Sequence, residues 1–132
     1  MRHHAEAFFA ATESKSPEVL EPHLAPDVVM EAPLTVHGAL EPVDTVTGKE
    51  ALLAWVRTAA ANFDRIRWRD QEFFAAGETV FVECGGDMTV AGTGEPYRNR
   101  YVFRFDVRDG LIRRVREYSN PVAVARLLEQ LA

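Results

Sequence analysis

Cysteine is almost absent from this sequence, because Cys84 is the single cysteine among 132 residues. No disulfide can form within the chain, so a reducing compartment such as the cytoplasm is the simplest expectation. The N-terminal stretch MRHHAEAFFAATESKS has no long apolar run of the kind that marks a signal peptide. No segment approaches the roughly 18 apolar residues that a membrane span needs. We therefore predict a cytoplasmic protein without a membrane partner.

The sequence also lacks an excess of positive charge. Its formal net charge is −5 at pH 7, and its arginines are spread along the predicted strands. Such a protein repels nucleic acid and anionic lipid, so we expect neither as a partner. The glycines of GTGEP do not lead from a strand into a helix, so they form no phosphate loop. His3, His4 and His23 lack metal-ligand spacing, and we predict no metal and no cofactor.

The composition is that of one globular domain. Apolar residues make up 47% and charged residues 27% of the chain, which is enough apolar material for one core. The length suits one ordinary domain and is too short for two. No repeat or linker divides the sequence, so we predict a single domain over residues 1–132.

Four segments have the periodicity or the capping residues of helices. They are residues 4–13, 16–24, 47–63 and the segment that follows Asn120. Thr47 and Glu50 stand in capping-box spacing at the start of the third helix. Asn120 is a suitable N-cap for the last helix. The last helix is expected to bury Val124, Leu127, Leu128 and Leu131.

Strands are expected mainly in the second half of the chain. They are residues 27–34, 65–74, 79–90, 97–107 and 111–118, the last two joined by a turn at Asp109–Gly110. Residues 34–47 have no regular period and are expected to form a loop or lid. Because strands and helices are segregated along the chain, we predict an α+β fold with a mainly antiparallel sheet.

The hairpin contains a carboxylate whose position needs an explanation. The apolar face of its first strand carries Asn99, Tyr101, Phe103, Phe105 and Val107. On the second strand Ile112 and Val115 differ in parity, so either Val115 and Glu117 point inward or Ile112 does. The second alternative buries two arginines, which favours the first. A three-residue connection then pairs Tyr101 with Glu117, whereas a two-residue connection pairs Phe103 with Arg116.

A carboxylate on an apolar face suits proton transfer. Desolvation raises the pKa of such a group, which prepares it to act as a general acid, or as a base near neutral pH. Glu117 could instead be structural, bonded to Tyr101 or to an arginine. His37, in the predicted loop, is a second candidate because histidine titrates near neutrality, although a loop histidine is often only solvated.

Several segments resemble a known family. APDVVMEAP, GKEALLAWV and FVECGG are similar to SnoaL-like proteins of the nuclear transport factor 2 and ketosteroid isomerase superfamily. VFRFDVRDGLIRRVREYSNPVAVARLL is similar to the end of the phenazine-biosynthesis A/B proteins. This resemblance implies a curved, mainly antiparallel sheet wrapped into a cone by three to four helices. It also implies a pocket in the cone and, commonly, a homodimer.

The residues of these families are only partly present. The position of the isomerase base holds Ala32, its oxyanion tyrosine falls near Phe8, and its protonated aspartate falls near Tyr101. The phenazine A/B pocket glutamate matches Glu117, but the helix histidine of that family falls at Trp55. The resemblance therefore argues against the ketosteroid isomerase mechanism and retains one proton-transfer candidate.

We predict a pocket protein for a small apolar organic ligand. Its function would be acid–base isomerisation, cyclisation or dehydration of a polyketide-like or cyclic carbonyl compound, with Glu117, Tyr101 and His37 as catalytic groups. The residues predicted to line the pocket are Asn99, Trp55, Phe103, Val115, Phe8 and Met30. The alternative is a non-catalytic ligand-binding or scaffold protein. The outer sheet face is expected to form a homodimer.

Overall fold

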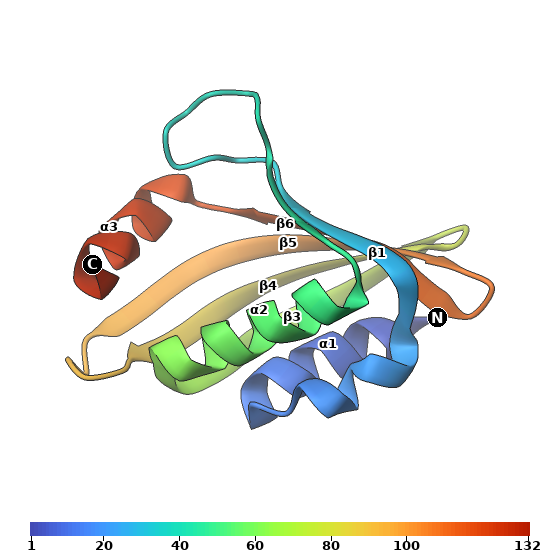
Figure 1. The fold of residues 1–132 in the computed structure, drawn as a ribbon, viewed down its shortest axis with the longest axis horizontal. Helices are drawn as coiled ribbons and strands as arrows, with labels where there is room; N and C mark the ends of the chain where they lie inside the picture. Colours follow the sequence, from blue (N-terminus) through green and yellow to red (C-terminus); the bar gives the residue numbers. More distant parts are fainter.

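The computed structural model describes residues 1–132 and contains three α-helices, two 3₁₀ turns and six strands (Figure 1). In chain order they are α1 (Arg2–Ser14), η1 (Pro17–Val19), η2 (Glu21–His23), β1 (Leu24–Ala32), β2 (Asp44–Thr47), α2 (Lys49–Asn62), β3 (Phe63–Ala76), β4 (Thr79–Val90), β5 (Pro96–Arg108), β6 (Leu111–Ser119) and α3 (Pro121–Leu131). No helix is both long enough and apolar enough to cross a membrane.

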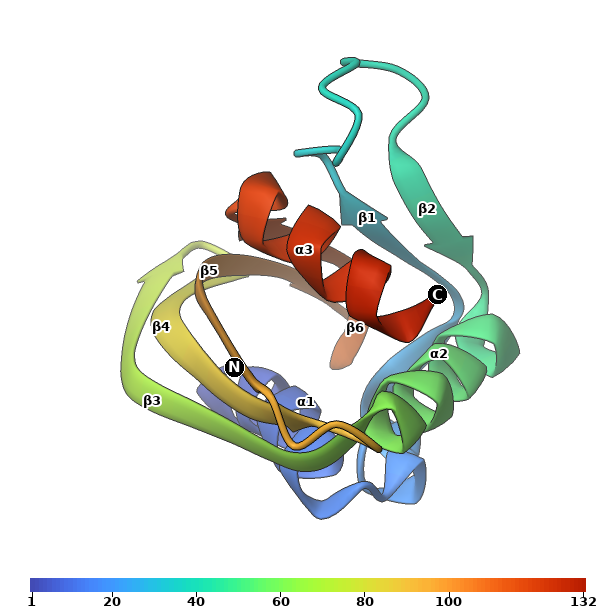
Figure 2. The ribbon, with the colours of Figure 1, turned by 90° about the vertical axis from the view of Figure 1, so that its left-hand side faces the viewer.

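The strands form one curved sheet in the order β2-β1-β6-β5-β4-β3. Every neighbouring pair is antiparallel except β1 and β6, which are parallel. Helices α1 and α2 lie on the same side of this sheet, and α3 lies in front of its open end in Figure 2. The predicted α+β cone with a mainly antiparallel sheet is therefore confirmed.

The core lies between the inner face of the sheet and α1 and α2. Strand alternation places one side chain in two on this face, and those of β4 and β5 are almost all buried. Phe8 and Phe9 of α1 contribute the opposing surface, with ring centroids 5.3 and 5.2 Å from that of Phe103. Ala5, Phe8, Phe9 and Thr12, which lie on one side of α1, are all buried.

The two segments that flank β1 differ from their predictions. Thr47 belongs to β2 and pairs with Val29, while Gly48 takes the N-cap position of α2 without a side-chain cap bond. The predicted capping box is therefore wrong. Residues 44–47 form an edge strand, which was not predicted because the segment is short and mostly polar. Residues 16–24 form η1 and η2 rather than one α-helix, because Pro22 cannot donate the backbone hydrogen bond that a continuous helix needs.

Helix α3 starts as predicted but is less buried. The Asn120 side chain accepts a hydrogen bond of 3.0 Å from the Val122 amide, so the expected N-cap is present. Leu127 is buried, but Leu128 and Leu131 remain 48% and 36% exposed. The helix lies at the end of the sheet and reaches its core through a single buried side chain. The expectation of four buried positions was therefore wrong.

The turn between β5 and β6 has two residues, not three. Asp109 and Gly110 both have positive φ, 53° and 73°, as a type I′ hairpin turn requires. Arg113 is an extra residue, because Val107 pairs with Ile112 while Asp106 pairs with Arg114. This bulge shifts the alternation by one residue. Ile112 and Val115, of opposite parity in the sequence, are therefore both fully buried.

The bulge also changes the partner of Glu117. Phe103 opposes Glu117, whereas Tyr101 opposes Ser119. The predicted pairing of Tyr101 with Glu117 was therefore wrong by one inward position. Opposed residues share a face, and Phe103 is fully buried, so Glu117 belongs to the inner face.

Candidate functional site

Glu117 lies among apolar side chains on the inner face of β6. Its cross-strand partner Phe103 and its neighbour Val115 are fully buried, as is Val82 opposite Phe103. Glu117 is half-buried, and its carboxylate takes part in no hydrogen bond or ion pair within the chain, since the carboxylate that Arg116 binds is Glu31. Burial raises the pKa of Glu117 to about 7, since nothing compensates the lost hydration of its charged form. Glu117 therefore exchanges its proton near neutral pH.

Tyr101 carries the hydroxyl group next to this carboxylate. It lies on β5 one inward position from Phe103, and the two rings stack with centroids 5.4 Å apart. Burial, together with Tyr97 and Glu117, raises the pKa of Tyr101 far above its ordinary value. The phenol therefore stays neutral and keeps its proton for hydrogen bonding.

Gly86 of β4 makes room for the Tyr101 ring. A Cβ atom at this position would lie 2.6 Å from Cε1 of Tyr101, well inside contact distance. A Cβ at the preceding residue, Gly85, would meet nothing closer than 3.9 Å. The Gly85–Gly86 pair within a strand is thus a sequence signal for a close approach, and it is the second glycine that is needed.

A second tyrosine of the site, Tyr97, was not among the residues predicted from the sequence. It is 8% exposed, and its hydroxyl oxygen lies 3.5 Å from that of Tyr101 and 2.8 Å from Nδ2 of Asn99. Tyr97 has the same parity as Asn99 and Tyr101, so continuing the alternation to the start of β5 would have found it. Three consecutive inward positions of one strand therefore form a connected polar group.

The predicted lining residues have the following places. Phe8, Met30, Phe103 and Val115 are buried in one core cluster, and the half-buried Trp55 packs against it. Met30 pairs with Val115 across β1 and β6. Phe8 stacks on Trp55 with centroids 6.5 Å apart. The structure therefore groups these apolar residues on the side of the sheet that carries Glu117.

His37 is placed differently from the other predicted catalytic residues. It is exposed on the loop between β1 and β2, which projects from the sheet in Figure 1. Its ring nitrogen is within hydrogen-bond distance of Thr35 Oγ1, at 3.5 Å, and of the Ala39 amide, at 3.3 Å. Both partners belong to the same loop, so the structure does not join His37 to Glu117.

Cys84 opposes Tyr101 on β4. Burial raises the pKa of its thiol to about 12, with the charges of Glu117 and Glu83 acting in the same direction. A thiol with this pKa is not a nucleophile at neutral pH. No group of three or more His, Cys, Asp or Glu side chains is arranged to hold a metal ion.

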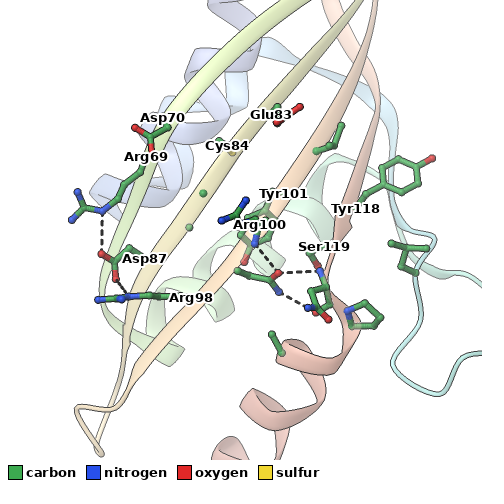
Figure 3. Close-up of a pocket in the computed structure, with 18 of the residues that line it drawn as sticks. Arg69, Asp70, Glu83, Cys84, Asp87, Arg98, Arg100, Tyr101, Tyr118 and Ser119 are labelled. Atoms are coloured by element: carbon green, nitrogen blue, oxygen red, sulfur yellow. Dashed lines mark hydrogen bonds and ion pairs between the residues drawn. The ribbon is translucent and has the colours of Figure 1, made fainter.

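A hollow of about 1300 Å³ lies along β4 and β5. Inward residues, among them Asn99 and Tyr101, contribute to its lining together with outward residues, whereas Glu117 does not. Figure 3 shows it with Asp87 between Arg69 and Arg98, at 3.0 and 3.6 Å. The outward-facing side chains that line it are mostly charged. The hollow thus reaches Tyr101 of the candidate site without reaching Glu117.

Comparisons with known proteins agree with this fold. The family model of the SnoaL-like domain matches residues 5–115. This protein therefore belongs to the SnoaL-like family, of the nuclear transport factor 2 and ketosteroid isomerase type of fold.

Among individual proteins, the chain is 44% identical over 50 residues to the uncharacterized protein YesE of Bacillus subtilis, a match that covers 38% of this chain and 34% of YesE. A Bacillus subtilis protein described as a candidate isomerase has a similar structure, with a TM-score of 0.81 and 25% identity over 96% of this chain and 91% of that one. The phenazine biosynthesis-related protein PhzB2 of Pseudomonas aeruginosa has a TM-score of 0.77 and 20% identity, covering 97% and 82% of the two chains. At this identity PhzB2 supports the fold alone.

Proposed function

We propose that this protein is a cytoplasmic acid–base catalyst that needs no cofactor and acts on a small polyketide-like or cyclic carbonyl compound. The observation that carries this proposal is the Glu117 carboxylate, unpaired among apolar side chains, with burial raising its pKa to about 7. A group of this pKa is present in both protonation states near neutral pH, which suits a general acid or base. The solved relative described as a candidate isomerase supports the same class.

In the proposed reaction Glu117 removes a proton from a carbon next to the carbonyl group. The electrons of that C–H bond form the enolate, whose oxygen is held by a hydroxyl group of the inner face. Glu117, now protonated, returns the proton to another carbon for isomerisation, or to a leaving hydroxyl group for dehydration. Phe103, Val115 and Met30 exclude water from this exchange. His37 takes part in this proposal only through a movement of its loop.

The test uses proton exchange on 2-tetralone, a bicyclic ketone with acidic C–H groups next to its carbonyl. Exchange in D₂O is followed by proton NMR with the wild-type protein and with Glu117→Gln. Loss of a general base should slow the exchange by roughly a hundredfold or more. Glu83→Gln is the matched control, since Glu83 lies exposed on the outer face of β4. Equal rates for wild type and Glu117→Gln would remove Glu117 from the mechanism.

A ligand-binding protein without catalysis is the second candidate. The observation in its favour is that His37 remains in its loop, so Glu117 has no imidazole partner for proton transfer. In this case Glu117 and the tyrosines only orient the ligand. Wild-type protein that binds the ketone without accelerating its exchange would support this alternative.

We also propose that the protein is a homodimer formed through the outer sheet face. This face combines exposed apolar side chains, such as Val102 and Phe74, with arginines and carboxylates that can pair with a second copy. Twofold association of such self-complementary faces is common. Light scattering at micromolar concentration should give twice the mass of one chain, and a monomer mass would contradict the proposal.

A further inference from the structure

The orientation of the Asn99 side chain is fixed by its hydrogen bonds. Its Oδ1 accepts from the amides of Arg100, at 2.8 Å, and of Asn120, at 2.9 Å. Both donors are backbone N–H groups, so an oxygen must face them. Nδ2 therefore points the other way, where it donates to the Asn120 carbonyl at 3.1 Å and to the Tyr97 hydroxyl at 2.8 Å. The hydrogen-bonding capacity of the amide is fully used within the chain, so Asn99 has nothing left to offer a ligand.

The Tyr97 hydroxyl oxygen is an acceptor from two sides. Asn99 Nδ2 donates to it at 2.8 Å, and the Tyr101 hydroxyl donates to it at 3.5 Å. A tyrosine hydroxyl has one proton besides its lone pairs. No hydrogen bond in the structure uses the proton of Tyr97, so it remains free for a further acceptor.

The direction of the bond between the tyrosines decides which of them keeps an unused proton, and in the structure Tyr101 is the donor. Two hydroxyl groups carry two protons, and one bond between them uses one proton. Asn99 supplies a donor, not an acceptor, so the second proton stays unused, and with Tyr101 as the donor it is the proton of Tyr97. Hydrogen bonds accepted by a hydroxyl oxygen polarise its O–H group and strengthen it as a donor.

The surroundings of Tyr97 favour a neutral ligand acceptor. Its ring stacks on Phe63 with centroids 5.9 Å apart, and it shares a buried cluster with Met88 of β4 and Leu127 of α3. A buried O–H group without an acceptor is unfavourable. A ligand carbonyl oxygen satisfies it without bringing a full charge into this apolar cluster.

We infer that Tyr97, rather than Tyr101, donates the hydrogen bond that holds the carbonyl oxygen of the ligand. Asn99 and Tyr101 are positioning residues that act through the Tyr97 hydroxyl. The ligand is then a ketone or quinone-type compound whose oxygen accepts a hydrogen bond from the Tyr97 hydroxyl. This inference rests on the proposed function only for the role of Glu117, because carbonyl binding needs no proton transfer.

The test is the ¹³C NMR shift of 2-tetralone labelled at its carbonyl carbon and bound to the protein. Hydrogen bonding moves this signal downfield, so the bound ketone should resonate several ppm downfield of its position in cyclohexane. Tyr97→Phe removes only the hydroxyl oxygen and should abolish most of this shift. The affinity should fall by roughly three- to tenfold, the scale of one neutral hydrogen bond. Tyr118→Phe, on the outer face, should change neither quantity, and the thermal midpoint of each variant shows whether it is folded.

The outcomes separate this inference from the proposed function. A carbonyl shift that disappears in Tyr97→Phe but persists in Tyr101→Phe supports Tyr97 as the donor, even if the wild-type protein exchanges no protons. A shift lost in Tyr101→Phe and kept in Tyr97→Phe overturns the inference. A wild-type protein that does not bind the ketone, or binds it without a downfield shift, overturns it as well.

Discussion

Glu117 and Asp106 lie on adjacent strands of one sheet, yet their surroundings change their pKa values in opposite directions. Glu117 on the inner face has no partner, and burial raises its pKa to about 7. For Asp106 on the outer face burial also raises the pKa, but hydrogen bonds from Arg104, Thr79 and Arg114 outweigh it and lower the pKa overall. The donor–acceptor distances are 3.0, 2.9 and 2.8 Å. The number of hydrogen bonds that a carboxylate receives therefore decides its charge.

The alternation of the strands produces this difference. Outer positions of β5 and β6 carry arginines, so an outer carboxylate meets a cation within a few ångströms. Asp87 follows the same rule, because a hydrogen bond from Arg69 lowers its pKa and Arg98 lies 3.6 Å away. Inner positions carry aromatic and aliphatic residues, and a carboxylate placed there stays unpaired. This arrangement keeps one group ready for proton exchange within an otherwise ion-paired sheet.

The largest predicted effect is the pH dependence of stability that Glu117 causes. Its pKa is raised from 4.5 to about 7 on folding, so the folded state holds a proton that the unfolded state has lost in this window. The stabilisation from this group is therefore complete below pH 4.5 and is lost as the pH rises to about 7. The loss should amount to roughly 3 kcal/mol at 1.36 kcal/mol per pKa unit.

Urea unfolding of wild type and Glu117→Gln across this pH range measures the effect. Glutamine does not ionise, so the variant should lack the decline and should be the more stable protein above neutral pH. If the free energies of unfolding of the two proteins changed in parallel with pH, Glu117 would be hydrated. The inner and outer faces would then not differ in their effect on a carboxylate.

The next largest effect should come from Gly86. Gly86→Ala forces a methyl group against the Tyr101 ring, and overpacking of this kind costs about 1–3 kcal/mol. Gly85→Ala is the matched control, since its methyl group would meet only ordinary contacts and alanine suits a strand better than glycine. Urea unfolding should therefore separate two substitutions at adjacent positions on opposite faces. Equal stabilities would mean that Tyr101 moves freely.

The sequence predicts the faces of the strands better than it predicts their register. Alternation over Asn99–Val107 identifies the inner face of β5 because its three aromatic residues share one face, while the other face is charged except at Val102. It fails at Arg113, because a bulge leaves no mark in composition and strict alternation places this arginine on the same face as Val115 and Glu117. The inward direction of Glu117 was therefore predictable, but its partner Phe103 was not.

Two further features of the site could not be read from the sequence. The free proton of Tyr97 depends on distances between side chains of β5 and the backbone of Asn120, which no pattern contains. The exposure of Leu128 depends on where α3 lies relative to the sheet. Helix periodicity predicts which residues share a side, but not how much of that side another element covers.

The smallest predicted effect concerns the outer face. Asp106→Asn removes the charge that pairs with Arg104 and Arg114. It should lower the free energy of unfolding at neutral pH by about 1 kcal/mol, the upper range for partly exposed ion pairs. Because the pKa of Asp106 is lowered on folding, its stabilisation exists above the ordinary aspartate pKa and is lost as the pH falls through the folded value. The pH dependence of stability that Asp106 causes is therefore opposite in sign to the one that Glu117 causes.

Urea unfolding at neutral and acidic pH tests the predicted effect of Asp106→Asn, with Asp27→Asn as the control. Asp27 also pairs with an arginine, Arg113, at 3.3 Å, but its side chain is 79% exposed, so solvent should screen the pair and the change should be too small to measure. Wild type and Asp106→Asn should converge in acid, where Asp106 itself becomes protonated. A difference that persists there would mean that Asp106 acts through neutral hydrogen bonds, such as the one from Thr79. Charge pairing would then not be what distinguishes the outer face from the inner one.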